Sequence, residues 1–368
     1  MKEEECRYSQ DSLDSKGKLL AQELAPIADT LLSRKFSPPI PIHNRHFQTI
    51  AGITGLVPPF IERKTGIVAK REFVEVAPGA KIALDYSLHE GPNNHPTVVI
   101  VPGITGYSRS PFSIGMANKA IHYGFNTVGV NFRGARDTGD SSNTLCHAGL
   151  SEDIRTVLED INNRGLTNIY IAAYSFGGNM VLKAVGEMGI DAQGKIGGVG
   201  LVSSVVDSEN SWQNIHRHYF YEQSVLRELK NAVKRQAGAY PENWDTSLSK
   251  GVKTIEEWNA TFQVGPKPIR WGFTDLQDYY QKASALPYVS KIAVPTFLIH
   301  AEDDPVVSVL PLKGERFVNN PQIFVMLTKN GGHGGFVNLR KAGDDLDRHW
   351  AQNRVMEFFR LLEENTKG

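Results

Sequence analysis

The chain has 368 residues, and its 40 Lys and Arg residues balance 40 Asp and Glu residues. This balance provides no strong long-range field that would favour nucleic acid or an anionic membrane surface as the main partner. A hydrophobic content of 40% is enough for a large packed core, and only two cysteines, Cys6 and Cys146, are present. Both features argue for a globular protein without a disulfide framework.

The amino-terminal sequence MKEEECRYSQDSLDSKG is acidic and polar, whereas a secretory signal begins with basic residues followed by an apolar run. Glycine or proline interrupts each apolar window before it reaches the roughly 20 residues that a membrane-spanning helix needs. We therefore expect a cytoplasmic protein without a transmembrane segment, for which peripheral contact with a membrane stays open.

Residues 12–32 carry leucine and isoleucine at helical spacing, which predicts an amphipathic helix. The mixed charge of its polar face favours packing on the core over contact with a membrane. The segment Ser37-Pro38-Pro39-Ile40-Pro41 then predicts an extended connector. We expect residues 1–60 to form an amino-terminal helix and proline-rich connector that pack on the core.

From about Arg71 short apolar runs alternate with helix-like stretches, a pattern that is typical of a parallel sheet. Their nearly continuous apolarity indicates strands buried on both faces. The runs are residues 98–101, 127–131, 169–172, 198–202, 296–299 and 324–327. We predict an α/β fold with one mostly parallel sheet, helices on both faces, and a core made of residues 61–205 and 286–368.

The strand–helix alternation stops between residues 206 and 285, where the sequence is polar, aromatic and basic. Tryptophan, tyrosine, phenylalanine and histidine are frequent in this segment. We predict a helical insertion that covers the site as a cap and lines an apolar pocket.

The segment Ala173-Tyr174-Ser175-Phe176-Gly177 follows a predicted strand and precedes an apolar stretch of helical character. Small residues around the serine permit a sharp turn between strand and helix, which presents the hydroxyl above the sheet edge. The alternative is that Ser175 is a helix N-cap with no chemical role.

A serine hydroxyl becomes a good nucleophile only when a histidine takes its proton and a carboxylate orients that histidine. His333 lies in a glycine-rich segment after one predicted strand, and Asp303 and Asp304 follow another. We favour Asp304 as the acid because Pro305 fixes the following turn. The alternative role of Asp303 is that of a loop carboxylate bound to a neighbouring backbone N–H.

The tetrahedral intermediate of acyl transfer also needs two hydrogen-bond donors aimed at its oxyanion. The backbone N–H of Phe176, directly after the serine, is one candidate. The backbone N–H of Ile104 is the other, because Gly103 lets the chain approach closely after the strand at 98–101. The alternative is an ordinary glycine turn.

With these residues the chain resembles the YheT-like branch of the α/β-hydrolase superfamily, which includes the abhydrolase-domain lipases and the plant embryogenesis-associated homologues. The resemblance runs from about His43 to Phe359 and includes the order serine, acid, histidine. It also rests on Arg45-His46-Phe47-Gln48-Thr49-Ile50, Asn131-Phe132-Arg133-Gly134, His147-Ala148-Gly149 with Glu152-Asp153-Ile154, Ser175-Phe176-Gly177-Gly178-Asn179 and Gly331-Gly332-His333-Gly334-Gly335-Phe336. Pro102 and Ala173 depart from the usual pattern.

The resemblance implies a serine carboxylic ester hydrolase that acts on short- to medium-chain acyl or lipid esters through an acyl-enzyme, with the triad Ser175, Asp304 and His333. We expect no cofactor and no metal, and we interpret Arg133 and His147 as mainly structural. Two alternatives stay open: an alcohol O-acyltransferase that uses the same triad, and a ligand-binding protein without catalysis. Physiological substrate, acyl length and oligomeric state do not follow from the sequence.

Overall fold

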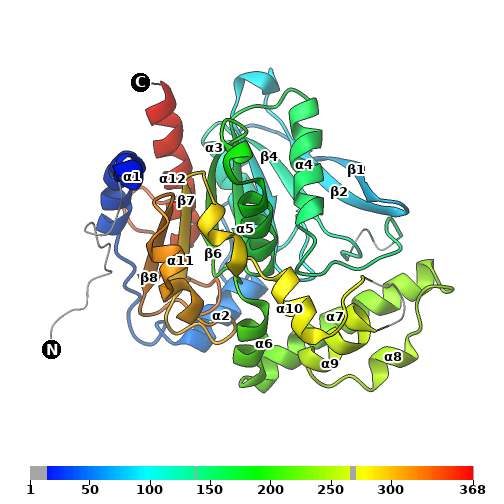
Figure 1. The fold of residues 1–368 in the computed structure, drawn as a ribbon. Coiled ribbons are helices and arrows are strands. Elements are labelled where there is room, and N and C mark those ends of the chain that lie inside the picture. Colours follow the sequence, from blue (N-terminus) through cyan, green and yellow to red (C-terminus); the bar gives the residue numbers. More distant parts are fainter. Residues whose placement is uncertain (1–14, 137, 139, 266–270, 368) are drawn as a thin grey trace.

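A twisted sheet forms the centre of the molecule (Figure 1). The computed structural model describes residues 15–136, 138, 140–265 and 271–367. Within them eight strands lie in the order β1-β2-β4-β3-β5-β6-β7-β8. The bounds are β1 Lys70–Ala77, β2 Ala80–Ser87, β3 Thr97–Val101, β4 Asn126–Asn131, β5 Ile169–Tyr174, β6 Ile196–Val202, β7 Thr296–Ala301 and β8 Ile323–Thr328. Strands β3 to β8 are parallel, whereas β2 pairs antiparallel with both β1 and β4.

The α/β fold predicted from the sequence is confirmed, and each of the six predicted strands lies inside one of β3 to β8. The hairpin of β1 and β2 was not predicted as a pair of strands. Strand β1 lies at the edge of the sheet, where exposed and half-buried residues follow one another. Such a strand lacks the continuous apolar run that reveals strands covered on both faces.

Two layers of helices cover the sheet. On one face α4 (Ser151–Asn163) and α5 (Phe176–Met188) pack together with η3 (Gly189–Ala192) and η5 (Leu286–Lys291). On the other face α1 (Ser15–Ser33), α3 (Pro111–His122) and α12 (Trp350–Lys367) share a second apolar cluster with the strands. Shorter elements are η2 (Pro92–Asn94), η6 (Leu310–Lys313) and α11 (Glu315–Val318). The sheet is thus buried from both sides.

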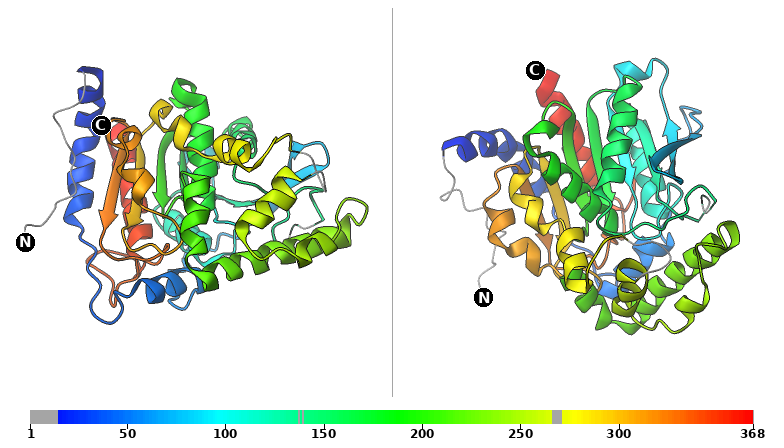
Figure 2. Two further views of the ribbon diagram at one scale, coloured as in Figure 1. Left: turned by 60° about the horizontal axis from the view of Figure 1, so that its bottom comes forward. Right: turned by 45° about the vertical axis from the view of Figure 1, so that its right-hand side comes forward.

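The amino-terminal segment contains two helices. In α1 the side chains of Leu24, Ile27 and Leu31 are buried against the same cluster as α12, so the described part of this helix packs on the core. The predicted position Leu13 lies outside the described residues. A second helix, α2 (Arg45–Thr54), was not predicted and lies near the carboxyl ends of the strands (Figure 2).

The segment between β6 and β7 is a helical insertion beside the carboxyl ends of the strands (Figures 1 and 2). It contains α6 (Ser208–His216), α7 (Tyr219–Ala239), α8 (Ser247–Lys250), α9 (Ile255–Asn259), η4 (Ala260–Val264) and α10 (Leu276–Ala283). Its own apolar cluster includes Val233, Trp244 and Trp258, and Ile104 and Leu145 of the sheet domain pack against that cluster. The insertion therefore adjoins the loop after β3.

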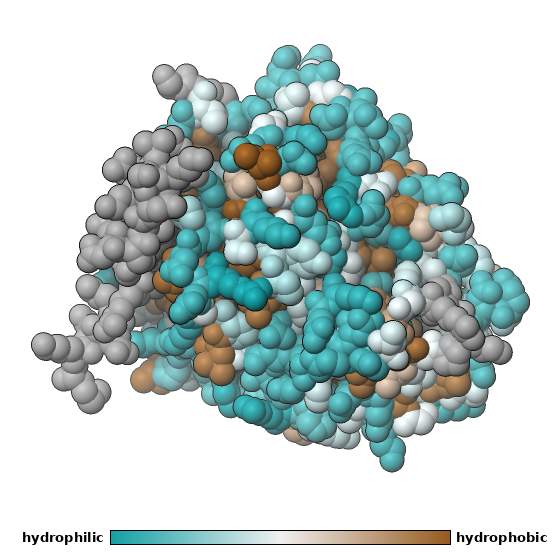
Figure 3. All heavy atoms as spheres, in the orientation of Figure 1, coloured by the Kyte–Doolittle hydropathy of each residue, from teal (hydrophilic) through white to brown (hydrophobic). Residues whose placement is uncertain are grey.

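No helix in the part of the chain that the structure describes has the length and apolar character needed to cross a membrane. On the face drawn in Figure 3, hydrophobic residues are dispersed among hydrophilic ones.

Candidate active site

Ser175 occupies a sharp turn between β5 and α5. Its backbone has φ 52° and ψ −121°, a conformation that costs energy for any residue with a side chain. The two glycines that follow Phe176 permit the turn, because a side chain at either position would clash. A Cβ on Gly177 would lie 2.1 Å from the carbonyl oxygen of Pro102, and one on Gly178 would lie 2.2 Å from Ser204 Oγ. The Ser175 hydroxyl makes no capping hydrogen bond to α5. Ser175 therefore stands at the N-cap position of α5, but its hydroxyl does not act as the cap.

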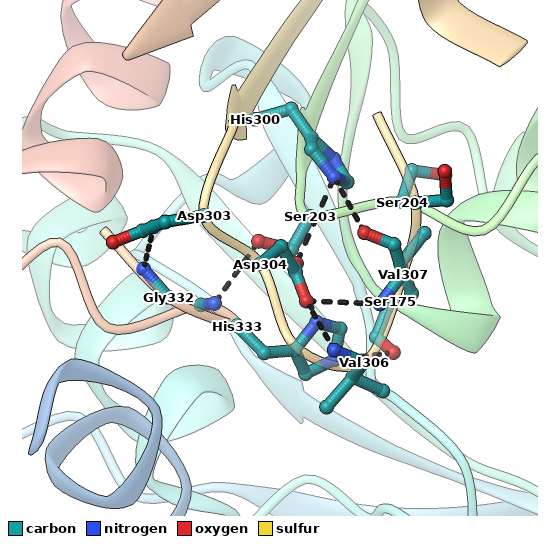
Figure 4. Close-up of polar contacts among 12 residues, drawn as sticks. Ser175, Ser203, Ser204, His300, Asp303, Asp304, Val306, Val307, Gly332 and His333 are labelled. Carbon is teal, nitrogen blue, oxygen red and sulfur yellow. Dashed lines mark hydrogen bonds and ion pairs between the residues drawn. The ribbon is translucent and has the colours of Figure 1, made fainter. Parts of the chain in front are cut away.

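The Ser175 hydroxyl instead contacts a histidine from the loop after β8. His333 Nε2 lies 2.9 Å from Ser175 Oγ, and His333 Nδ1 lies 2.8 Å from Asp304 Oδ2 (Figure 4). All three side chains are buried. Because an ionised Asp304 can only accept, it selects the tautomer in which Nδ1 carries the proton. Nε2 is then left as an acceptor for the serine proton.

The neighbouring aspartates have different partners. Asp304 Oδ1 accepts hydrogen bonds from the backbone N–H groups of Val306 (2.7 Å) and Val307 (2.9 Å), which fixes the carboxylate behind the histidine. Asp303 accepts from the N–H of Gly332 at 2.9 Å and makes no hydrogen bond to His333 (Figure 4). Burial raises the pKa of Asp303. The structure thus brings Asp304 to His333, while Asp303 anchors the loop that carries the histidine.

A second histidine, His300 at the end of β7, lies behind the acid. It is fully buried, its Nε2 is 3.1 Å from the carbonyl oxygen of Val307 and 3.7 Å from Asp304 Oδ2, and burial lowers its pKa. A neutral ring whose Nε2–H donates to Val307 fits these contacts. His300 was not predicted from the sequence, where only its position four residues before Asp304 could have indicated it.

Helix α2 holds the histidine loop in place through polar side chains. The backbone N–H of His333 donates to Thr49 Oγ1 at 2.9 Å. Gln48 accepts from the N–H of Val337 at 2.7 Å and donates to its carbonyl oxygen at 3.0 Å. On the other side the N–H of Gly334 donates to Ser203 Oγ at 3.0 Å. The loop is therefore fixed by side chains from two elements that lie far from it in the sequence.

The two proposed oxyanion donors lie on either side of the serine. Phe176 is the first residue of α5, where helical N–H groups have no partner within the helix. A Cβ added to Gly103 would lie 3.5 Å from Ser175 Cβ, so the loop that carries Ile104 runs next to the serine. In the described part of the chain, neither the Ile104 nor the Phe176 N–H donates to another backbone group. Both remain available to a ligand.

A cavity of about 210 Å³ opens above Ser175 and His333. Its walls come from three regions: the sheet domain, the insertion and α2. They include Ile104, Phe112 and Tyr174, then Ile215, Tyr221 and Val225, then Gly52 and Ile53. A small apolar recess of about 20 Å³ lies on the far side of Ile104, between Phe176 and α7. The space next to the serine is thus mainly apolar.

A larger cavity, of about 350 Å³, lies under α3 against β2 and β4. The ion pair of Arg71 and Asp85 lines it, together with Ser108, whose hydroxyl also contacts Asp85. None of the three residues Ser175, Asp304 and His333 reaches it. Size alone therefore does not mark the reactive site.

The sequence profile of the alpha/beta hydrolase fold matches residues 96–338, which is most of the chain. The chain belongs to the α/β hydrolase fold family. This hydrolase is 28% identical to the protein YheT of Escherichia coli (strain K12), over 92% of this chain and 95% of that protein. It is 25% identical to the embryogenesis-associated protein EMB8 of Picea glauca, over 88% and 71% of the two chains. The human phospholipase ABHD3 is 24% identical, over 77% and 70%. The resemblance noted from the sequence motifs is confirmed.

Two motif residues of this hydrolase lie beside the site without touching the serine. Arg133 forms a buried ion pair with Asp153 and donates to Thr144 Oγ1 at 3.0 Å. His147 Nδ1 accepts from the N–H of Gly149 at 3.1 Å, and its ring packs against Trp271 and other aromatic rings. Burial, assisted by the positive charge of Arg133, lowers the pKa of His147 to about 3. These contacts account for both residues by packing and hydrogen bonding.

Proposed function

We propose that this α/β hydrolase cleaves carboxylic esters, with Ser175 as nucleophile, His333 as general base and Asp304 as the group that orients His333. One observation carries the proposal: a continuous hydrogen-bonded chain runs from Asp304 through His333 to Ser175 and ends beneath a mainly apolar cavity. A receptor would need the cavity but not this chain of three polar groups.

The proposed reaction has two steps. Ser175 Oγ attacks the ester carbonyl while its proton passes to His333 Nε2, and Asp304 stabilises the resulting imidazolium. When the tetrahedral intermediate collapses, the bond to the alcohol oxygen breaks and His333 returns its proton to the leaving alcohol. Water then enters, loses a proton to His333 and attacks the acyl-enzyme. The acid leaves and Ser175 regains its proton.

The Ile104 and Phe176 N–H groups are proposed to hold the oxyanion of each tetrahedral intermediate. Two arguments support this assignment: both residues adjoin Ser175, and neither N–H donates to the backbone in the described residues. Phe176 in addition stands at the amino terminus of α5, where the helix dipole favours negative charge. Pro102 cannot donate, so the second donor comes from further along the loop.

We propose that the substrate is a lipid or other acyl ester with a short- to medium-length acyl group. The cavity volume of about 210 Å³ is below the 300 Å³ or so at which pockets begin to enclose drug-sized ligands. Its apolar walls favour an alkyl chain over a sugar or a phosphate. The insertion contributes Ile215 and Val225 to these walls, so we assign residues 206–285 the role of a cap. The name of the relative ABHD3, a phospholipase, supports a lipid ester.

The proposal is tested by labelling with a fluorophosphonate probe, which reacts covalently with activated serines. We expect the wild type to label at Ser175, and the Ser175→Ala and His333→Ala variants not to label. A series of p-nitrophenyl esters then measures the preferred acyl length, and added alcohol distinguishes hydrolysis from acyl transfer by the product formed. Failure of the folded wild type to label or to hydrolyse any ester would contradict the proposal.

A further inference from the structure

We propose that the mouth of the Ser175 cavity docks onto the surface of a lipid membrane through two exposed apolar elements. The first is the outer face of α2, with Phe47, Ile50, Ile53 and the adjoining Leu56. The second is the first turn of α7, with Tyr219 and Phe220. We call these six residues together the docking face. The inference deepens the proposed function, since it makes a membrane lipid the source of the ester, but docking itself does not require Ser175.

Helix α2 is amphipathic in the opposite sense to most surface helices. Its polar residues Gln48 and Thr49 are fully buried, because they bind the backbone of the histidine loop. Ala51 is also buried, but the large apolar residues face outward: Ile50 is 47% exposed, and Leu56, after the end of the helix, is 61% exposed. Exposed apolar residues that gather on one face mark an interaction surface, whereas single ones do not.

The first turn of α7 continues this apolar surface. Phe220 is 86% exposed and Tyr219 is also exposed, although both are large and aromatic. The turn is held against α2 by a hydrogen bond of 2.9 Å between His46 Nδ1 and Tyr221 Oη, with the two rings stacked at 5.9 Å. The two elements therefore form one surface.

The docking face borders the opening of the cavity. Ile53 belongs to the face and also lines the cavity, and Tyr221, next to Phe220 in the sequence, lines it from the other side. Ser175 and His333 lie at the bottom of the same space. A lipid held at this surface would have its ester within reach of the cavity without first crossing water.

The charges around the face favour a membrane as the occupant. Arg45 and Arg217 adjoin it, and no ion pair of either is found among the described residues. Burial lowers the pKa of His218, and the positive charges of Arg45 and Arg217 lower it further. Of the carboxylates nearby, Glu228 forms an ion pair with Arg136, and Glu222 is buried, where it contacts His216 and accepts from the N–H of Ile255. Apolar and aromatic residues bordered by unpaired arginines suit the acyl layer and the phosphate groups above it.

The test measures sedimentation of the Ser175→Ala protein, which cannot consume lipid, with phosphatidylcholine vesicles that contain or lack phosphatidylserine. We expect binding to both, and stronger binding with phosphatidylserine. The double change Ile50→Ser and Phe220→Ser should lower the partition coefficient about tenfold or more, since two apolar side chains no longer enter the lipid. Replacing Arg45 and Arg217 by Gln should weaken binding to the phosphatidylserine vesicles about fivefold for each charge removed.

A control replaces two other exposed apolar residues, Val68→Ser (85% exposed) and Ile190→Ser (73% exposed). Ile190 lies in η3, which follows the end of α5 opposite to Ser175, so this variant should bind vesicles as Ser175→Ala does. In a background with Ser175 intact, the Ile50 and Phe220 variant should hydrolyse soluble p-nitrophenyl butyrate at the wild-type rate.

The outcomes separate docking from catalysis. Vesicle binding without any esterase activity would leave docking in place and contradict the proposed function. Hydrolysis of soluble esters without vesicle binding, or equal binding by the Ile50 and Phe220 variant, would overturn docking. A wild-type dimer that this variant dissociates, in the absence of vesicle binding, would also overturn it and identify the face as a contact between two copies of the chain.

Discussion

Replacing Asp304 by Asn is the sharpest test of the triad geometry. Asp304 Oδ1 accepts from the N–H groups of Val306 and Val307, and Asn can keep both bonds only if its carbonyl oxygen takes that position. Its NH₂ group then faces His333 Nδ1 across the distance that is now 2.8 Å. Because an amide NH₂ can only donate, Nδ1 must become an acceptor and the proton moves to Nε2. His333 then cannot take the proton of Ser175.

We expect this wrong tautomer to lower kcat/KM about 10⁴-fold, which corresponds to about 5 kcal/mol of transition-state stabilisation. The assay is hydrolysis of the best p-nitrophenyl ester, with thermal unfolding to verify the fold. Asp303→Asn is the matched control: its carbonyl oxygen can still accept from Gly332, and it makes no hydrogen bond to His333. We expect a loss of less than about tenfold for that variant, the size of one weakened hydrogen bond. A larger loss for Asp303→Asn than for Asp304→Asn would refute the reasoning.

Three further predictions concern the surroundings of the site. Thr49→Val removes the acceptor of the buried His333 N–H. Unfolding in urea should therefore show a free energy of unfolding lower by about 1–3 kcal/mol, and kcat/KM should fall, whereas Thr49→Ser should keep the wild-type stability and kcat/KM. Arg133→Met leaves Asp153 as a buried charge without its partner. The free energy of unfolding in urea should fall by about 3–5 kcal/mol and should partly recover when Asp153→Leu is added. The pKa of His147 falls from 6.5 to about 3 on folding, so the unfolded chain binds a proton that the folded chain does not, and stability should fall as the pH drops from 6.5 towards 3. His147→Phe should flatten this part of the stability profile; an unchanged acid slope would contradict the assignment.

The parallel part of the sheet was predictable because its strands are covered on both faces. Strand β3, with all five residues buried, reads as an uninterrupted apolar run. The positions of Ser175, Asp304 and His333 followed from this, since each lies in the turn or loop that follows a parallel strand, and parallel strands end at one edge of the sheet. The hairpin of β1 and β2 was missed because its outer strand is half exposed, and the turn dipeptide Pro78-Gly79 was the signal that could have revealed it.

The choice between Asp303 and Asp304 illustrates where sequence patterns reach their limit. Adjacent residues after a strand project in different directions, and their directions depend on the backbone of the turn that follows. Here the N–H groups of Val306 and Val307 point at Asp304 and hold it behind the histidine, while the N–H of Gly332 holds Asp303. Pro305 favoured Asp304, the residue that contacts His333 in the structure, but could not supply these three contacts.

The orientation of α2 could not be predicted either, because hydrophobic periodicity alone would have turned its apolar face towards the core. Its pattern predicts that Phe47 and Ile50 face the core, whereas Gln48 and Thr49 are buried there together with the small Ala51. The physical reason is that the core on this side is the backbone of the histidine loop, whose N–H and carbonyl groups need polar partners. Burying the polar side of a helix leaves its apolar side exposed. The same contacts that position His333 therefore leave an apolar surface at the mouth of the cavity, so that the proposed roles of His333 and of the docking face both depend on one arrangement of α2.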